Sequence, residues 1–267
     1  KLQLKRDDVL LALDEGDAQK LKELLKKHPQ KVRLQDGKRP ILHVAVAAGR
    51  VDCVKELLHM GAPKDDRDDS SETQVTALLL ALEKREPAIA NYLLDKGADV
   101  FKADAEGTLP LHMAAAACSL PMVDRILKRM TELKRKENHV LRVDMNGQQA
   151  LHYAAGEGNI DLMKALVGKY DADPECKDKD DMTPLMVLAQ AGHDACITTY
   201  IRDCMANVRA ADSDGMTSLH HAASSGQHKC IQALLEEGAP LDAALPPGTS
   251  LTAGATPLHL ASAGGHV

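Results

Sequence analysis

The chain has 267 residues, of which 44% are hydrophobic and 27% are charged, but only 2% are aromatic, with one Phe and no Trp. Large rings usually contribute much of a globular core, so we expect this core to consist of Leu, Ala, Val, Ile and Met instead. The formal net charge of −6 argues against general binding of nucleic acids or membrane surfaces, because both favour a basic face. No apolar run approaches the roughly 18 residues of a membrane-spanning helix, and the polar start is unlike a signal peptide.

The N-terminal stretch predicts two helices on either side of Gly16. Val9, Leu10 and Ala12 supply apolar positions for the first helix, and residues 17–27 fit a second helix that is rich in lysine. Such a helix has the polar outer face that the end of a repeat array presents to water.

A short motif then recurs along the chain, in its fullest form as Thr-Pro-Leu-His. Its marker leucines stand 33 to 40 residues apart, at Leu42, Leu78, Leu111, Leu151, Leu185, Leu219 and Leu258. A period of this length is typical of repeat proteins, in which each unit packs only against its neighbours.

Each full unit has the same order: a short helix after the motif, a Gly seven residues after the marker leucine, a second helix and a hairpin. The Gly residues are expected to take the left-handed backbone that reverses the chain, at Gly49, Gly158, Gly192, Gly226 and Gly265. Arg85 and Cys118 stand where this Gly is expected. Their side chains must either bear the left-handed conformation or loosen the turn.

Repetition of Thr-Pro-Leu-His in one register resembles the ankyrin repeat family. The resemblance implies an all-α solenoid of stacked helix-turn-helix units with β-hairpin loops, in about eight repeats of which the first and last are incomplete or capping. We expect one domain over residues 1–267, with repeats at about 1–35, 36–69, 70–104, 105–144, 145–178, 179–212, 213–251 and a truncated 252–267.

The histidines and the absence of catalytic motifs indicate structure rather than chemistry. The resemblance implies that the motif histidines bond the backbone of neighbouring hairpins, at His43, His112, His152, His220 and His259. No Gly-x-Ser-x-Gly elbow, phosphate-binding loop or His-Glu-x-x-His motif is present. We therefore expect no catalytic residue, no metal site and no cofactor, and we do not expect an enzyme.

Three cysteines share one register, because Cys53, Cys196 and Cys230 each lie four residues after the turn Gly, where an inward apolar residue belongs. No Cys-x-x-Cys pair occurs, which argues against a zinc site. The resemblance to ankyrin repeats implies a location inside cells, so we expect reduced thiols and a cytoplasmic location, with the nucleus as the alternative. Cys176 falls in a polar hairpin and is expected to be the most exposed thiol.

In the ankyrin family, partner contacts come from hairpin residues that flank the Gly and from the end of the first helix. The matching positions here are Met145, Asn146, Gln148, Glu157, Lys179, Asp180, Met182, Gln190, Ser213, Asp214, Met216, Ser224 and Ser225. Exposed methionines would give an adaptable apolar surface. The alternative is that some of the three pack against the next hairpin.

A basic stretch offers a second surface, on a helix that the residues from Arg129 to His139 are expected to extend. Its members are Arg125, Lys128, Arg129, Lys134, Arg135 and Lys136. They fit a solvated helix end, which the helix dipole favours, or a dock for an acidic partner or a lipid head group.

The leading hypothesis is a protein-protein interaction scaffold that binds a protein or peptide in a concave groove of hairpins and first helices. The alternative is a targeting or regulatory ankyrin arm of a larger enzyme or channel. The chain has no initiator Met, and its last motif stops at Val267 where a second helix should begin. We therefore expect a fragment of a longer protein, and we expect it to be monomeric. From its charge and the lack of a long apolar run, we expect it to bind no nucleic acid and not to insert into a membrane.

Overall fold

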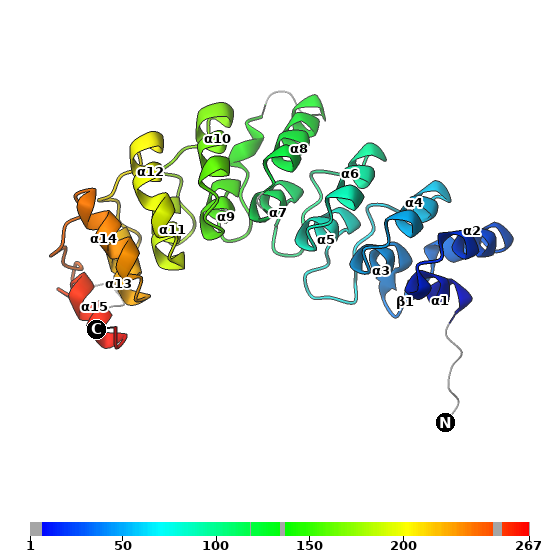
Figure 1. Ribbon diagram of the computed structural model, residues 1–267, viewed down its shortest axis with the longest axis horizontal. Helices are drawn as coiled ribbons and strands as arrows, with labels where there is room; N and C mark the ends of the chain where they lie inside the picture. The colour runs from blue at the N-terminus through cyan, green and yellow to red at the C-terminus, as the bar shows by residue number, and fades with distance from the viewer. Residues whose placement is uncertain (1–6, 118, 134–136, 248–252, 267) are drawn as a thin grey trace. The chain divides into compact units, whose positions relative to one another are not determined.

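The computed structural model describes residues 7–117, 119–133, 137–247 and 253–266 (Figure 1). The chain is mostly helical, which confirms the expected all-α class. It divides into two compact units, residues 1–113 and 114–267, and each is described by itself.

The first unit consists of helix pairs joined by short turns. The pairs are α1 (Asp8–Glu15) with α2 (Ala18–Lys27), α3 (Ile41–Ala47) with α4 (Val51–His59), and α5 (Ala77–Glu83) with α6 (Pro87–Asp95). A 3-10 turn η1 (Pro29–Arg33) precedes the strands β1 (Gln35–Asp36) and β2 (Arg39–Pro40), which pair antiparallel around Gly37. α7 (Pro110–Ala116) crosses the boundary between the units.

The second unit continues the same alternation. Its elements are α8 (Leu120–Leu133), η2 (His139–Leu141), α9 (Ala150–Gly156), α10 (Ile160–Tyr170), α11 (Pro184–Ala191), α12 (Asp194–Cys204), α13 (Ser218–Ser224), α14 (His228–Glu236) and α15 (Pro257–Ala263). First helices pack in one row, α9 on α11 and α11 on α13, and second helices in another, α10 on α12 and α12 on α14. Each unit therefore buries its apolar faces between successive pairs, as repeat proteins do.

The expected hairpin loops are mostly turns rather than strand pairs. Among the described residues only β1 and β2 form a ladder, and the bridges Arg67–Thr76 and Ala211–Thr217 are isolated. In three hairpins of the second unit, an Asp side chain accepts hydrogen bonds from backbone N–H groups and closes the turn.

The reversal between the two helices of a pair uses the left-handed backbone, as expected. Gly158 has φ of 67°, and a Cβ there would lie 2.5 Å from Nδ1 of His193. Arg85 takes the same conformation with φ of 56°, and its N–H still donates to Leu82 O at 3.0 Å. Arg85 therefore bears the conformation instead of loosening the turn, whereas Cys118 lies outside the described residues.

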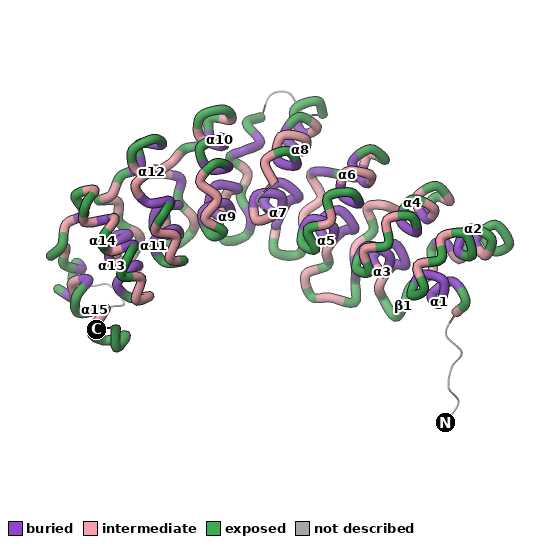
Figure 2. The backbone as a smooth tube through the Cα atoms, in the orientation of Figure 1, coloured by how far each residue is buried: buried purple, intermediate pink, exposed green. Residues whose placement is uncertain are grey.

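The core is aliphatic, as the composition predicts. Its fully buried side chains are mainly Leu, Ile, Val and Ala, and Tyr200 is the largest of those described. Figure 2 shows the buried residues gathered on the helices, with exposed residues on the turns between them. The Tyr200 hydroxyl donates to Pro174 O at 2.8 Å, so this polar group remains satisfied inside the core.

Motif histidines join neighbouring units, as the resemblance implies. His43 Nε2 lies 3.0 Å from Val75 O, and His152 Nε2 lies 3.1 Å from Met182 O. The other ring nitrogen of His152 accepts the Gln149 N–H at 3.2 Å, at the start of α9. One imidazole thus caps its own helix and holds the next hairpin, which confirms a structural role for these two residues.

One prediction about the cysteines is confirmed and another is wrong. Cys53, Cys196 and Cys230 are buried, which confirms their inward register. The expectation that Cys176 is the most exposed thiol is wrong, because its side chain is buried and Sγ lies 3.7 Å from His152 Nδ1. Its neighbours in sequence are polar, but the Cys176 side chain itself faces inward.

Candidate functional site

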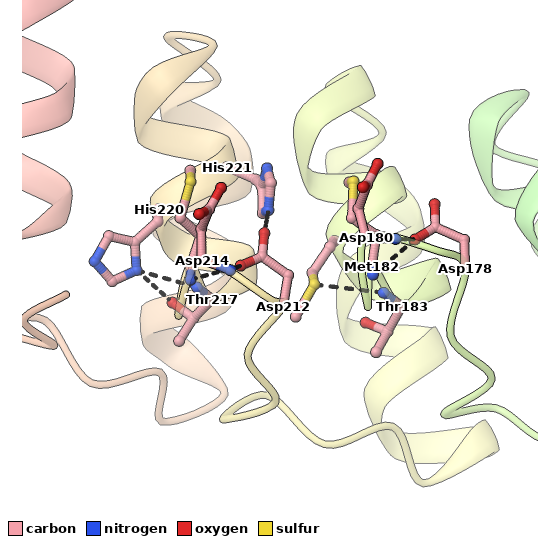
Figure 3. Close-up of polar contacts among 11 residues, drawn as sticks. Asp178, Asp180, Met182, Thr183, Asp212, Asp214, Thr217, His220 and His221 are labelled. Atoms are coloured by element: carbon pink, nitrogen blue, oxygen red, sulfur yellow. Dashed lines mark hydrogen bonds and ion pairs between the residues drawn. The ribbon is translucent and has the colours of Figure 1, made fainter. Parts of the chain in front are cut away.

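Three hairpin turns of the second unit are closed in the same way by an aspartate. Oδ1 of Asp144 accepts the N–H groups of Asn146 and Gln148, both at 2.8 Å. Asp178 and Asp212 repeat the arrangement 34 and 68 residues further on. Asp178 accepts the N–H groups of Asp180 and Met182, and Asp212 accepts those of Asp214 and Met216, all at 2.8 to 3.0 Å. Figure 3 shows the latter two turns. Because an ionised acceptor strengthens such bonds, each turn holds a defined shape.

The second carboxylate oxygen ties two of these turns to a first helix. The Tyr153 hydroxyl of α9 donates to Asp144 Oδ2 at 2.7 Å, and His221 Nε2 of α13 lies 2.8 Å from Asp212 Oδ2. Val187 holds the corresponding position in α11 and has no donor to offer. The turns at Asp144 and Asp212 are therefore anchored more firmly than the turn at Asp178.

Successive turns are also hydrogen-bonded to one another. Lys179 N–H donates to Asn146 O at 2.9 Å, and Ser213 N–H donates to Asp180 O at 3.0 Å. The first junction is tight, because a Cβ on Gly147 would lie 2.9 Å from the Lys179 nitrogen. The three turns are therefore held in a row before any partner arrives, and such preorganisation lowers the ordering cost of binding.

The structure brings the thirteen predicted partner-binding residues to the surface, since none is buried. Those described as exposed are Met145, Asn146, Glu157, Lys179, Asp180, Gln190, Ser213 and Ser224, and those half-buried are Gln148, Met182, Asp214, Met216 and Ser225. Glu157, Gln190 and Ser224 lie at the ends of α9, α11 and α13, and α11 packs against both of the other helices.

The three methionines of this surface are not equivalent. Met145 is 61% exposed, whereas Met182 and Met216 are half-buried and donate their N–H groups to the turn aspartates. Met145 is therefore the strongest candidate for an apolar contact.

Sequence reasoning missed two neighbours of Met145. Leu141 and Val143 are 43% and 51% exposed and alternate with covered residues toward the turn. The signal was the pattern Leu-x-Val-x-Met, in which three apolar residues alternate with Arg142 and Asp144.

The basic stretch has a different environment. Arg125 and Arg129 are half-buried on α8, Lys128 is exposed, and Lys134, Arg135 and Lys136 lie outside the described residues. Arg129 lies 3.6 Å from Glu132. A cavity of about 720 Å³ opens beside the end of α8, with Lys128 and Lys169 but also Asp124, Glu132 and Glu137 in its lining. The described basic residues thus alternate with acidic ones, and a basic dock stays a prediction.

Neither a metal-binding cluster nor a membrane-spanning helix is found among the described residues. No group of three or more His, Cys, Asp or Glu side chains there could hold a metal ion. None of the helices described is both long and apolar enough to cross a bilayer.

The stacked helix pairs and the row of fixed turns define a class: a helical repeat protein. The family model for ankyrin repeats in three copies matches residues 9–104, 101–178 and 151–245. The chain therefore belongs to the ankyrin repeat family, whose fold is a non-catalytic interaction module. These matches do not establish the count of about eight repeats, which stays a prediction together with the repeat boundaries.

Several curated proteins are similar to this chain. Human transient receptor potential cation channel subfamily A member 1 is 29% identical over 67% of the chain and 18% of its own length. Palmitoyltransferase AKR1 of Lachancea kluyveri is 28% identical over 76% of the chain and 28% of its own length. E3 ubiquitin-protein ligase KEG of Arabidopsis thaliana is 27% identical over 86% of the chain and 14% of its own length. The chain thus spans between 14% and 28% of these relatives.

Proposed function

We propose that the three aspartate-closed turns, together with the ends of α9, α11 and α13, form the contact surface for a protein or peptide partner. The observation that carries this proposal is the hydrogen-bonded row of turns, which holds exposed Met145, Lys179 and Ser213 side by side. An apolar residue among short polar groups suits the centre and rim of an interface. In the ankyrin family these positions line the concave groove.

A change at Met145 tests this surface. Met145→Asp places a charge where an apolar contact is expected, and it should lower the affinity for a captured partner at least about tenfold, which is roughly 1.4 kcal/mol. Stability should change by no more than about 0.5 kcal/mol, because the side chain is 61% exposed. Affinity capture with mass spectrometry would identify the partner, and a titration beside a thermal melt would measure both effects.

Leu241→Asp is the matched control, because Leu241 is also apolar and 59% exposed but follows α14 and belongs to none of the three turns. It should leave the affinity unchanged. If Met145→Asp also binds normally, the contact surface lies elsewhere, and the described basic residues of α8 are the next candidate.

A second candidate function is that the chain is the targeting or regulatory arm of a larger enzyme or channel. It is supported by relatives named as a cation channel, a palmitoyltransferase and a ubiquitin ligase, of which this chain spans only a small part. Sequencing of the complete reading frame tests this proposal, since a frame that encodes no further domain would remove it.

The cellular location is part of the same proposal. Five cysteines of the described residues are free, and such thiols suit the reducing cytoplasm or, as the alternative, the nucleus. Microscopy of a fluorescent fusion of the full reading frame checks this location, and a secreted fusion would contradict it.

A further inference from the structure

Each of the three aspartate-closed turns of the second unit is approached by a five-residue arm in which exposed and covered residues alternate, except that Glu175 in the second arm is half-buried. The first arm is residues 141–145, the second 175–179 and the third 209–213. In each arm the second and fourth residues are half-buried or buried: Arg142, Asp144, Cys176, Asp178, Ala210 and Asp212. The first, third and fifth residues are exposed, apart from half-buried Glu175, and are called the outer residues of each arm.

The outer side of the first arm is entirely apolar. Leu141, Val143 and Met145 are 43%, 51% and 61% exposed. The three side chains form an apolar strip between the end of η2 and the turn at Asp144. Scattered single apolar residues are normal on a surface, but a contiguous group is typical of an interaction site.

The outer side of the second arm is basic. Lys177 and Lys179 are exposed there, and the third outer residue, Glu175, accepts the Asn207 N–H at 2.8 Å. Glu175 is therefore engaged within the protein. Lys177 lies 3.7 Å from Asp181, and both side chains are about half exposed, so their attraction is weak and leaves Lys177 able to meet another charge.

The third arm adds one cation and little else. Its outer residues are Arg209, Ala211 and Ser213, all of them exposed. The outer surface thus changes from apolar on the first arm to basic on the second, and the hydrogen bond from Lys179 to Asn146 O keeps these two arms together.

We propose that the first and second arms bind an acidic segment of a partner protein, with its apolar side chains on Leu141, Val143 and Met145 and its carboxylates on Lys177 and Lys179. This inference rests on the proposed function and specifies the chemistry of the partner. Burial of the apolar strip supplies affinity, and the lysines orient the segment and speed its association.

The chemistry of the arms favours a protein segment over other anions. Nucleic-acid strands are usually held by aromatic side chains that stack on bases, and neither arm contains one. The exposed Asp180 beyond Lys179 also repels acidic groups at the turn itself. The carboxylates of the partner are therefore confined to the arm, which gives the bound segment a direction.

Short synthetic peptides measured by fluorescence anisotropy test the inference on the whole chain. One peptide carries leucines followed by aspartates, a second replaces the aspartates by lysines, and a third replaces the leucines by serines. We expect the first to bind at least about tenfold more tightly than the other two. Its affinity should fall as salt is added, because the lysine contacts are exposed.

Variants of the two arms assign the contacts. Val143→Asp should weaken binding of the leucine-aspartate peptide at least about tenfold. The double change Lys177→Glu and Lys179→Glu should weaken it similarly and should strengthen binding of the leucine-lysine peptide. Leu241→Asp and Lys229→Glu are matched controls, because both residues are exposed and lie away from the arms.

Thermal melts accompany every variant, and Met145→Asp replaces Val143→Asp if the latter does not fold. Equal binding of the leucine-lysine peptide, an unchanged preference after charge reversal, or no binding up to about 1 mM would overturn the inference. Tighter binding of an oligonucleotide or of anionic lipid vesicles would also overturn it. If Met145→Asp still weakens the binding of a captured partner while these peptides do not bind, the proposed function stands without this inference.

Discussion

His221 Nε2 lies 2.8 Å from Oδ2 of Asp212, while Oδ1 of the same carboxylate accepts two N–H groups of its own turn (Figure 3). Tyr153 and Asp144 form the corresponding contact 68 residues earlier, at 2.7 Å. A carboxylate that bonds both its turn and a helix transmits the position of the helix to the turn. The position of the turns at Asp144 and Asp212 is therefore set by the helix stack rather than by the loops alone.

Removal of the Tyr153 hydroxyl tests this anchoring. Tyr153→Phe leaves one oxygen of the buried Asp144 without its donor, so we expect a loss of about 1–2 kcal/mol in the free energy of unfolding. Urea denaturation measures this loss. Tyr92→Phe is the control, because the structure shows no hydrogen bond from that hydroxyl to any described residue. Equal stabilities of the two variants would contradict the anchoring.

Much of the fold follows from the sequence because the repeated motif and the turn glycines recur with the same spacing. The Leu-His motif places most of the first helices, and Gly158 and its equivalents place most of the reversals. Arg85 could not be decided in advance, because both a strained and a loosened turn satisfy the same sequence. The structure shows the left-handed form, which the regular hydrogen bonds on either side impose.

The site was harder to predict from the sequence, because a shift of one residue exchanges the exposed and the covered side chains where they alternate. Cys176 was placed outward from its polar neighbours, but it faces His152. Leu141 and Val143 were overlooked although they face outward. The family positions located the row of turns, while the half-burial of Met182 depends on packing that composition does not encode.

Met205 should be a source of strain that glycine relieves. It ends α12 with φ of 60°, and its side chain is 82% exposed, so Met205→Gly loses little packing. We expect an increase of about 0.5–1 kcal/mol in the free energy of unfolding. Gly238 holds the equivalent place after α14 with φ of 83°, and Gly238→Ala should cost a similar amount. Thermal melts check both, and destabilisation by Met205→Gly would refute the strain.

The buried thiols should react slowly in the native protein. Burial raises the pKa of all five described cysteines, to about 12 for Cys176 and about 11 for Cys230. Because the thiolate is the reactive form, labelling with a thiol reagent in a Cys118→Ser background should be at least about a hundredfold slower than in urea. The test fails if Cys176 is modified rapidly in buffer.

Buried imidazoles should make the protein less stable in mild acid. Burial lowers the pKa of His43, His152 and His220 below its usual value. The unfolded chain therefore binds protons at a pH where these folded imidazoles remain neutral. Since stability rises with pH wherever the unfolded state holds more protons, their contribution is complete above about pH 6.5 and declines as the pH falls below that value.

Urea midpoints should accordingly stay level from about pH 8 to 7 and fall between about pH 6.5 and 5. Burial alone would raise the pKa of Asp68, but hydrogen bonds from Ser70 and Arg39 outweigh burial and lower it. The contribution of Asp68 to stability is therefore lost only below about pH 4. Burial raises the pKa of Glu175, so that residue opposes the decline. His152→Gln should lower stability at pH 7, because the imidazole contact to Met182 O is lost, and should flatten the acid slope. A midpoint that rises on acidification would show that the histidines do not control this window.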